Sequence, residues 1–151
     1  MLFSRQSEYA IRALTFLALQ PAGKLAGGRA ISEAEGIPMP FLWKILHSLT
    51  KRRLIRSFKG LHGGYELALP ASSITLSMII GATDSLEFTG SCVLGLPQCD
   101  EEHACPLHEA WKDLRGKVIA MLEHNSLADL AEAVGARVSP AARKPRAKGA
   151  N

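Results

Sequence analysis

The chain has 151 residues, the size of one ordinary domain, and its 47% hydrophobic and 21% charged residues are typical of a globular protein. No apolar run approaches the roughly 20 residues that span a bilayer, the N-terminus lacks the order of a signal peptide, and three cysteines, an odd number, do not suit a secreted disulfide framework. Residues 1–70 hold ten Lys/Arg against four Asp/Glu, residues 71–135 hold three against ten, and residues 136–151 hold five against none, for a net charge of +4. These values predict a soluble, cytoplasmic protein without a membrane partner, whose basic first half suits a polyanion.

The beginning of the chain predicts a long helix and a short one. The long helix should run from about Ser4 to Gln20, because Ser4 can cap it and apolar residues recur within it at helical spacing. A short helical piece near Ile31–Glu35 follows and is closed by Gly36.

A second strong helix is expected to begin near Pro40, a residue suited to a first helical turn. Its apolar residues recur at i, i+3, i+4 and i+7, and they are Leu42, Ile45, Leu46 and Leu49. Its outward face and its end carry polar and basic residues, which are Lys44, His47, Ser48, Lys51 and Arg52.

A β-hairpin should come next. Leu54–Phe58 reads as one strand and Tyr65–Leu69 as the other, with a glycine-rich turn between them. Two helices followed by such a hairpin are the order of a winged helix-turn-helix, in which one helix enters the major groove of DNA and the hairpin, or wing, contacts the flanking backbone or minor groove. We therefore predict that double-stranded DNA contacts the outward face of the second helix and Arg56, Lys59 and His62 of the wing. The alternative interpretation of these charges is a basic surface that is merely solvated.

The second half of the chain predicts a further helix over 75–84 and an irregular segment over 85–105. The range 106–125 reads as a long helix with a heptad seam that needs a partner helix. The residues of this seam are Leu107, Trp111, Leu114, Val118 and Met121. Ser126-Leu127-Ala128-Asp129 predicts a capping box that opens one more short helix, which Gly135 should end.

The predicted fold class is mainly α: a winged helix-turn-helix with a β-hairpin wing and a long C-terminal dimerisation helix. The expected parts are a DNA-binding domain over 1–84, a cysteine segment over 85–105, the dimerisation helix with a short capping helix over 106–135, and a basic, disordered tail over 136–151.

The cysteine segment points to a metal. Cys92, Cys99 and Cys105 place three thiols in irregular chain, where they can converge, and soft thiolates select iron–sulfur clusters or zinc. A structural zinc site usually takes four protein ligands in paired CxxC spacings, which this segment lacks. The spacing therefore favours a cluster over zinc, over free thiols and over a dithiol–disulfide switch. Three residues are candidates for a fourth ligand: His108, Glu8 and His103.

Five stretches form a combined signature. They are Tyr9-Ala10-Ile11-Arg12-Ala13-Leu14, Phe41-Leu42-Trp43-Lys44-Ile45-Leu46, Leu54-Ile55-Arg56-Ser57, Lys59-Gly60 with Gly63-Gly64-Tyr65-Glu66-Leu67, and the three-cysteine segment followed by Leu107-His108. In these stretches the chain resembles the winged-helix iron–sulfur regulators that include IscR, NsrR and RirA. The resemblance covers roughly residues 1–130, and the wing signature with the cysteine segment is highly specific in combination.

The resemblance implies a homodimer joined through the long helix, a cluster held by Cys92, Cys99 and Cys105, and a pseudo-palindromic operator whose binding the cluster governs. His108 matches the histidine ligand of IscR-like members. Glu8 stands where NsrR-like members supply an aspartate from the partner subunit. The choice between a 2Fe-2S and a 4Fe-4S cluster therefore stays open.

Two positions of the wing depart from the family pattern. Lys59 stands where an arginine is common, and Leu61-His62 replaces smaller residues. Because lysine is a point charge without the planar fork of a guanidinium, we expect this wing to bind DNA in a more electrostatic way.

The sequence thus predicts an iron–sulfur-dependent transcription regulator, a repressor that senses redox stress, nitric oxide or iron–sulfur status, and not an enzyme. The alternatives are a zinc-stabilised or thiol-switch winged-helix regulator, a scaffold that binds only protein, and a thiol redox enzyme. The enzyme is disfavoured because acidic surroundings should raise the pKa of the thiols.

Overall fold

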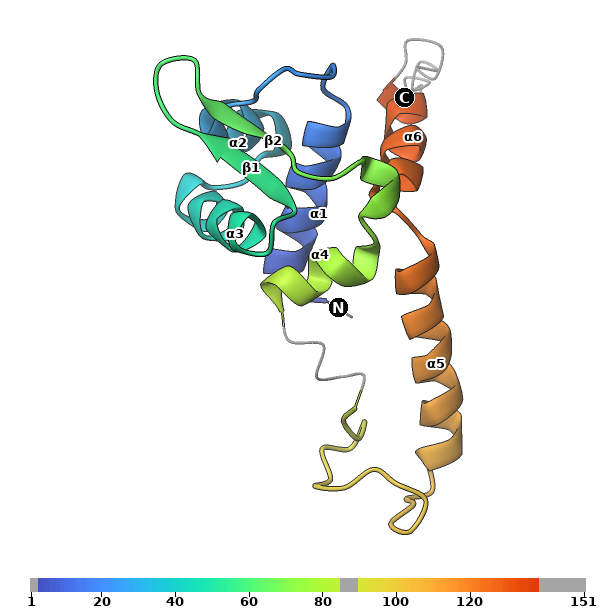
Figure 1. Cartoon of the computed structure of the whole chain (residues 1–151). Coiled ribbons are helices and arrows are strands. Elements are labelled where there is room, and N and C mark those ends of the chain that lie inside the picture. The colour runs from blue at the N-terminus through green and yellow to red at the C-terminus, as the bar shows by residue number, and fades with distance from the viewer. Residues whose placement is uncertain (1–2, 85–89, 139–151) are drawn as a thin grey trace, which may run out of the picture.

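A computed structural model describes residues 3–84 and 90–138. Within these ranges it contains six α-helices, a short 3-10 turn and one two-stranded antiparallel hairpin, so the predicted mainly helical winged fold is confirmed. Helices α1 to α4 and the hairpin gather at one end, α5 extends away from them, and α6 returns to pack along α1 (Figure 1). Residues 85–89 of the predicted cysteine segment and 139–151 of the predicted basic tail lie outside the described residues.

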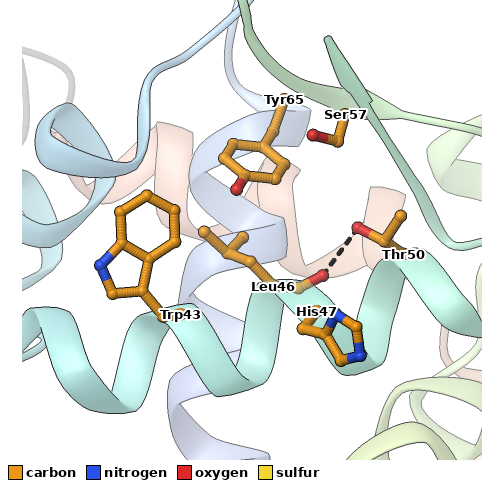
Figure 2. A pocket seen from close by; sticks show the side chains of 6 residues that line it. All are labelled: Trp43, Leu46, His47, Thr50, Ser57 and Tyr65. Atoms are coloured by element: carbon orange, nitrogen blue, oxygen red, sulfur yellow. Dashed lines mark hydrogen bonds between the residues drawn. The ribbon is translucent and has the colours of Figure 1, made fainter. Parts of the chain in front are cut away.

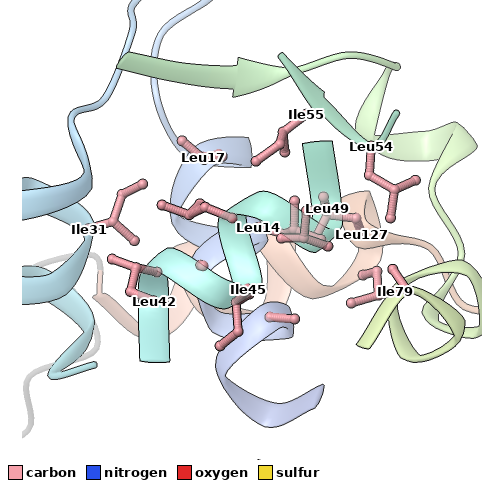
Figure 3. Close-up of a cluster of buried hydrophobic side chains, with 14 of the residues drawn as sticks. Leu14, Leu17, Ile31, Leu42, Ile45, Leu49, Leu54, Ile55, Ile79 and Leu127 are labelled. Carbon is pink, nitrogen blue, oxygen red and sulfur yellow. The ribbon is translucent and has the colours of Figure 1, made fainter. Parts of the chain in front are cut away.

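Helix α1 spans Arg5–Ala18 and begins, as predicted, after Ser4, whose side chain accepts a hydrogen bond from the Ser7 N–H (3.2 Å). Its buried face includes Ala10, Ala13, Leu14 and Leu17, at the spacing of one helix face. The side chains from α1, α3, α4, α6 and the base of the hairpin that meet there form the hydrophobic core (Figure 3).

Helices α2 (Gly28–Glu35) and α3 (Met39–Lys51) form the helix-turn-helix. α2 begins earlier than the predicted Ile31, and Gly36 ends it in left-handed backbone with φ 61°. Pro40 lies in the first turn of α3, where its missing N–H costs no hydrogen bond. All four positions of the predicted apolar stripe of α3 are buried, namely Leu42, Ile45, Leu46 and Leu49.

The wing consists of β1 (Ile55–Phe58) and β2 (Gly64–Leu67), both shorter than the predicted strands. On its other edge β2 is joined to the body of the domain, because Tyr65 and Ala26 exchange two backbone hydrogen bonds of 2.8 and 3.0 Å. The hairpin is thereby held at its base, and its turn projects outward (Figure 1).

The 3-10 turn η1 (Ala71–Ser73) leads into α4 (Leu76–Thr83). Helices α5 (His108–His124) and α6 (Leu127–Val138) complete the fold. The predicted capping box of α6 is formed, since the Ser126 N–H donates to the Asp129 carboxylate (2.7 Å) and the Asp129 N–H donates to the Ser126 hydroxyl (3.3 Å). Among the described helices, none is both long and apolar enough to cross a membrane.

Gly135 does not end α6, and this prediction is wrong. The helix continues to Val138, and Gly135 is not among the residues with positive φ. A Cβ atom at this position would lie 3.4 Å from the side chain of Leu19, directly after α1. The glycine therefore serves close packing of α6 against the end of α1.

The C-terminal end of α4 is hydrogen-bonded to two other helices. The Asp84 carboxylate accepts bonds from the hydroxyl groups of Ser4 (2.6 Å) and Ser7 (2.7 Å) at the start of α1. Ser48 of α3 donates its hydroxyl to the Ala82 carbonyl. Burial alone would raise the pKa of Asp84, but the hydrogen bonds from Ser4 and Ser7 outweigh burial and lower it. The C-terminal end of α4 is therefore held against both α1 and α3.

Arg53 follows α3 in left-handed backbone, with φ 59°. Its N–H donates to the Thr50 carbonyl and the Leu54 N–H donates to the Leu49 carbonyl, both at 3.0 Å. This pattern is a Schellman cap, in which glycine is the usual residue. An L-residue in this conformation costs about 1–2 kcal/mol, whereas glycine costs roughly 0.5–1 kcal/mol in chain entropy.

We expect Arg53→Gly to raise the free energy of unfolding by about 0.5–1 kcal/mol, the difference between these two costs. Urea denaturation of DNA-free protein, followed by circular dichroism, measures the change. Arg52→Gly is the matched control and should lower stability, because φ of Arg52 is −83° and no strain is relieved there. A less stable Arg53→Gly protein would mean that the arginine side chain stabilises the fold by more than its backbone strain costs.

Candidate functional site

The outward face of α3 is basic and open. Lys44, His47 and Lys51 are exposed on it, and Arg52 is exposed at its C-terminal cap. Ser48, also a predicted DNA contact, is less accessible than these residues. It is half-buried, and its hydroxyl donates a hydrogen bond to the Ala82 carbonyl of α4. Its side chain therefore supports the fold and is engaged within the protein.

A hollow of about 310 Å³ lies between α3 and the wing. Figure 2 shows its lining, which is Trp43, Leu46, His47, Thr50, Ser57 and Tyr65. The Trp43 ring rises from α3 and is 53% exposed, and the Tyr65 ring reaches from β2 toward the same space. Sequence analysis missed both rings, although Trp43 lies one helical turn before His47, a predicted contact. Aromatic and hydroxyl groups in this place are suited to the methyl groups and polar edges of bases.

The wing carries three predicted contacts with different surroundings. Arg56 forms an ion pair with Glu66, directly across the strand pair, with Nη2 and Oε1 2.8 Å apart. Lys59 and His62 are exposed near the turn, and among the described residues Lys59 has no ion-pair partner. Because Glu66 offsets the charge of Arg56, Lys59 is the stronger candidate for neutralising a phosphate.

The three cysteines are free thiols on the irregular chain between α4 and α5. Cys92 is buried, and Cys99 and Cys105 are half-buried. The Cys99 and Cys105 side chains contribute to lowering the pKa of the Cys92 thiol, by less than nearby backbone N–H groups do. Cys99 and Cys105 are thus neighbours of Cys92, and the convergence of the three thiols on one metal stays a prediction.

The cysteines differ in acidity. Backbone N–H groups of Leu94 (3.4 Å) and Leu96 donate to the Cys92 sulfur and lower the pKa of this thiol. Burial raises the pKa of the Cys99 thiol, and the negative charge of Cys92 raises it further. The expectation that acidic surroundings raise the pKa of every thiol is wrong for Cys92, because local N–H donors decide its ionisation.

His108 is the fourth-ligand candidate that the structure brings to the thiols. It is only 5% exposed, and its Nδ1 atom lies 3.6 Å from the Cys99 sulfur. Its own N–H donates to the Cys105 carbonyl (2.9 Å) as α5 begins. His103 instead pairs with Asp100, with Nδ1 and Oδ1 2.9 Å apart.

The other candidate, Glu8, lies half-buried in the first turn of α1. Over residues 3–84 and 90–138, no group of three or more His, Cys, Asp or Glu side chains is already spaced to hold a metal ion. The thiols and His108 are thus a donor set of the right chemistry rather than a formed coordination site.

Arg115 is a neighbour of the cysteines that sequence analysis missed. It lies on α5 two helical turns after His108, and its charge lowers the pKa of Cys99, opposing the larger effect of burial. Its Nη1 atom is buried and has no hydrogen-bond partner among the described residues. The sequence could have indicated Arg115, because it lies seven residues after His108 and residues at this spacing lie on the same face of a helix.

The predicted seam of α5 is largely open in the single chain. Leu107 (46%), Leu114 (53%) and Met121 (46%) are strongly exposed, and Val118 is half-buried. The indole Nε1 of Trp111 donates to the Ser91 carbonyl (3.0 Å), which ties the cysteine segment to α5. An apolar seam of this kind is suited to a second helix.

Comparisons with known proteins extend over most of the chain. The model of the Rrf2 family, described as an iron-dependent transcriptional regulator, matches residues 3–133. A helix-turn-helix-type transcriptional regulator of Mycobacterium tuberculosis (strain CDC 1551 / Oshkosh) is 37% identical over 133 residues, which are 87% of this chain and 81% of that protein. The transcriptional regulator IscR of Aliivibrio salmonicida is 30% identical over 130 residues, which are 86% of this chain and 77% of that protein.

Two solved structures share the fold. CymR, the global cysteine regulator of B. subtilis, superposes with a TM-score of 0.75 at 23% identity, over 87% of this chain and 96% of that chain. IscR of T. potens gives a TM-score of 0.70 at 21% identity, over 95% and 91% of the two chains. The family match and the identities of the curated relatives confirm the resemblance found in the sequence. The chain therefore belongs to the Rrf2 family of transcriptional regulators and is not an enzyme.

Proposed function

We propose that this DNA-binding regulator holds an iron–sulfur cluster through Cys92, Cys99, Cys105 and His108, and that the cluster sets its affinity for DNA. The contact of 3.6 Å between the Cys99 sulfur and the buried His108 Nδ1 carries the proposal. Buried polar groups normally have protein partners, and an imidazole buried against a thiol is an arrangement suited to shared coordination of a metal.

The three thiols and the His108 imidazole suit an iron–sulfur cluster chemically. The N–H groups of Leu94 and Leu96 favour the thiolate form of Cys92, which is the form that binds metal. A bound cluster would supply a centre that responds to oxidants, nitric oxide or the supply of iron and sulfide. We favour His108 over Glu8 as the fourth ligand, because the His108 Nδ1 atom lies 3.6 Å from the Cys99 sulfur within one chain, whereas Glu8 would have to come from the partner subunit.

The cysteine segment lies between two elements that connect it to the DNA-reading face. At one end Asp84 and Ala82 are bonded to α1 and α3. At the other end His108 and Trp111 tie the segment to the first turns of α5. Ligation at the cysteines would therefore fix the start of α5. Helix α5 packs against α4, which is bonded to α3 through Ser48.

We further propose that two chains pair through the seam of α5 and bind a pseudo-palindromic operator. In such a dimer a small change in the angle of α5 alters the spacing of two α3 helices. Operator affinity then changes although every DNA-contacting residue stays the same, because the dimer must match the separation of its half-sites. In this arrangement the protein acts as a repressor whose operator affinity follows the state of the cysteine segment.

Protein reconstituted anaerobically with ferrous iron and sulfide should be coloured and contain iron and sulfide in similar amounts. Cys99→Ala should remove the visible absorption, because a central thiolate is lost, whereas His103→Ala should retain it. Absorption and circular dichroism spectra with iron and sulfide assays test this. Colourless protein with stoichiometric zinc would instead support a zinc-stabilised regulator.

The fourth ligand is tested separately by His108→Ala and Glu8→Gln. We expect His108→Ala to change the spectrum and shorten the lifetime of the colour in air, and Glu8→Gln to change neither. Loss of the cluster in Glu8→Gln with a normal spectrum in His108→Ala would assign the ligand to α1.

Lys59→Ala should weaken binding to all duplexes and reduce the slope of log affinity against log salt by about one. Lys59→Arg is the matched control and should keep the slope, since the charge is retained. Fluorescence anisotropy with labelled duplexes at several salt concentrations measures both. An unchanged slope in Lys59→Ala would show that the wing lysine does not contact phosphate.

Leu114→Asp should convert a dimer into monomers, because it places a charge in the proposed seam. Ala120→Asp, at an exposed position of α5 outside the seam, should leave the dimer intact. Sedimentation velocity distinguishes the two states. Dimers that persist in Leu114→Asp and in Val118→Asp would place the subunit interface elsewhere.

A further inference from the structure

The tip of the wing exposes a large apolar side chain. Gly60 and Gly63 close a turn, with the Gly63 N–H donating to the Gly60 carbonyl at 3.0 Å, and Leu61 and His62 occupy its two corners. Leu61 is 95% exposed, whereas the other exposed large hydrophobic side chains are 38–54% exposed. Leu61 therefore has almost no contacts within its own chain.

The turn that carries Leu61 is sterically fixed. A Cβ atom on Gly63 would lie 2.1 Å from the Phe58 carbonyl oxygen, and one on Gly64 would lie 2.8 Å from the Ala26 carbonyl oxygen. Gly60 has φ 102°, which also favours glycine. The glycines are thus required by the close path of the hairpin itself, and they hold Leu61 at a defined place beyond the body of the domain.

The surroundings of Leu61 combine apolar side chains, a cationic lysine and a polar histidine. Lys59 and His62 are exposed on either side of it in the sequence, and Phe58, at the end of β1, is 46% exposed. The minor groove of DNA offers phosphates along both walls and apolar sugar and base surfaces between them. Its width admits a narrow turn, and leucine is among the side chains that proteins insert between base steps there.

We propose that Leu61 is an apolar wedge that enters the minor groove, partly unstacks one base step and bends the operator. This inference rests on the proposed DNA-binding function and deepens it. Lys59 and His62 face the phosphates of the groove walls, and Leu61 is buried between bases. Flexible steps such as TA and CA are unstacked most easily, so the wing selects sequence through DNA deformability without hydrogen bonds to bases.

The test uses the full-length protein and a duplex enriched from a random pool by binding to the wild-type protein. Fluorophores at the two ends report bending by energy transfer, and 2-aminopurine beside each flexible step reports unstacking. Leu61→Ser should lose the bend and the 2-aminopurine signal and bind the duplex on the order of 10- to 100-fold more weakly, as expected when a leucine is no longer buried. Its salt slope should not change, because no phosphate contact is removed.

Two controls separate the wedge from the charges. Leu61→Met should keep the bend, since it retains apolar volume, and Lys59→Ala should lower the salt slope but keep the bend. The unfolding midpoint of Leu61→Ser should equal that of the wild type, because the side chain has almost no contacts to lose.

A wild-type complex with straight, fully stacked DNA, or a Leu61→Ser complex with the wild-type bend, would overturn the wedge and indicate that Leu61 contacts a protein. If the wild-type protein binds no duplex at low salt, the proposed DNA-binding function itself fails. That result differs from the two bending results that would overturn only the wedge.

Discussion

The hydrogen bonds at the end of α4 hold three helices in one arrangement. Asp84 receives two hydroxyl groups from the start of α1, and the neighbouring Ala82 carbonyl receives the hydroxyl of Ser48 from α3. Each such bond contributes only about 1 kcal/mol to stability, but their geometric effect is larger than their energy. They join α3, the helix proposed to contact DNA, to the C-terminal end of α4.

Residues 90–107 have little regular structure, and a few specific contacts order them. Backbone N–H groups hold the Cys92 sulfur, the indole of Trp111 holds the Ser91 carbonyl, and His108 lies buried beside Cys99. These contacts come from within the segment and from the first turns of α5. Long irregular stretches in compact domains usually have a functional reason, and here the stretch carries the three thiols of the proposed donor set, with His108 beside Cys99.

The sequence was sufficient for α1 and α3, because each has an apolar stripe of clear period. The buried positions of α3 from Leu42 to Leu49 and the cap at Ser4 were predictable for this reason. The prediction for Gly135 was wrong because a glycine can either end a helix or allow close packing of two helices. Only the position of the Leu19 side chain in the structure shows that Gly135 allows close packing. Ser48 was predicted to contact DNA because it is a polar residue on the outward face of α3. Its hydrogen-bond acceptor, the Ala82 carbonyl, is 34 residues away in sequence, so local sequence does not reveal this bond.

The candidate site was predicted only in part for a similar reason. Spacing identified the thiols and proposed His108, but nothing local distinguished His108 from Glu8; the burial of His108 beside Cys99 supports His108 within one chain. Trp43 and Tyr65 come from different elements, so the hollow that they line has no signature in either stretch alone.

The hydrogen bond from Trp111 to Ser91 has a practical consequence as well. The chain contains two tryptophans, Trp111 against the cysteine segment and Trp43 on the open face of α3. Each indole is thus an intrinsic optical reporter at one end of the regulator. Replacing either tryptophan with phenylalanine would leave ultraviolet emission that follows the remaining site alone, without any attached dye.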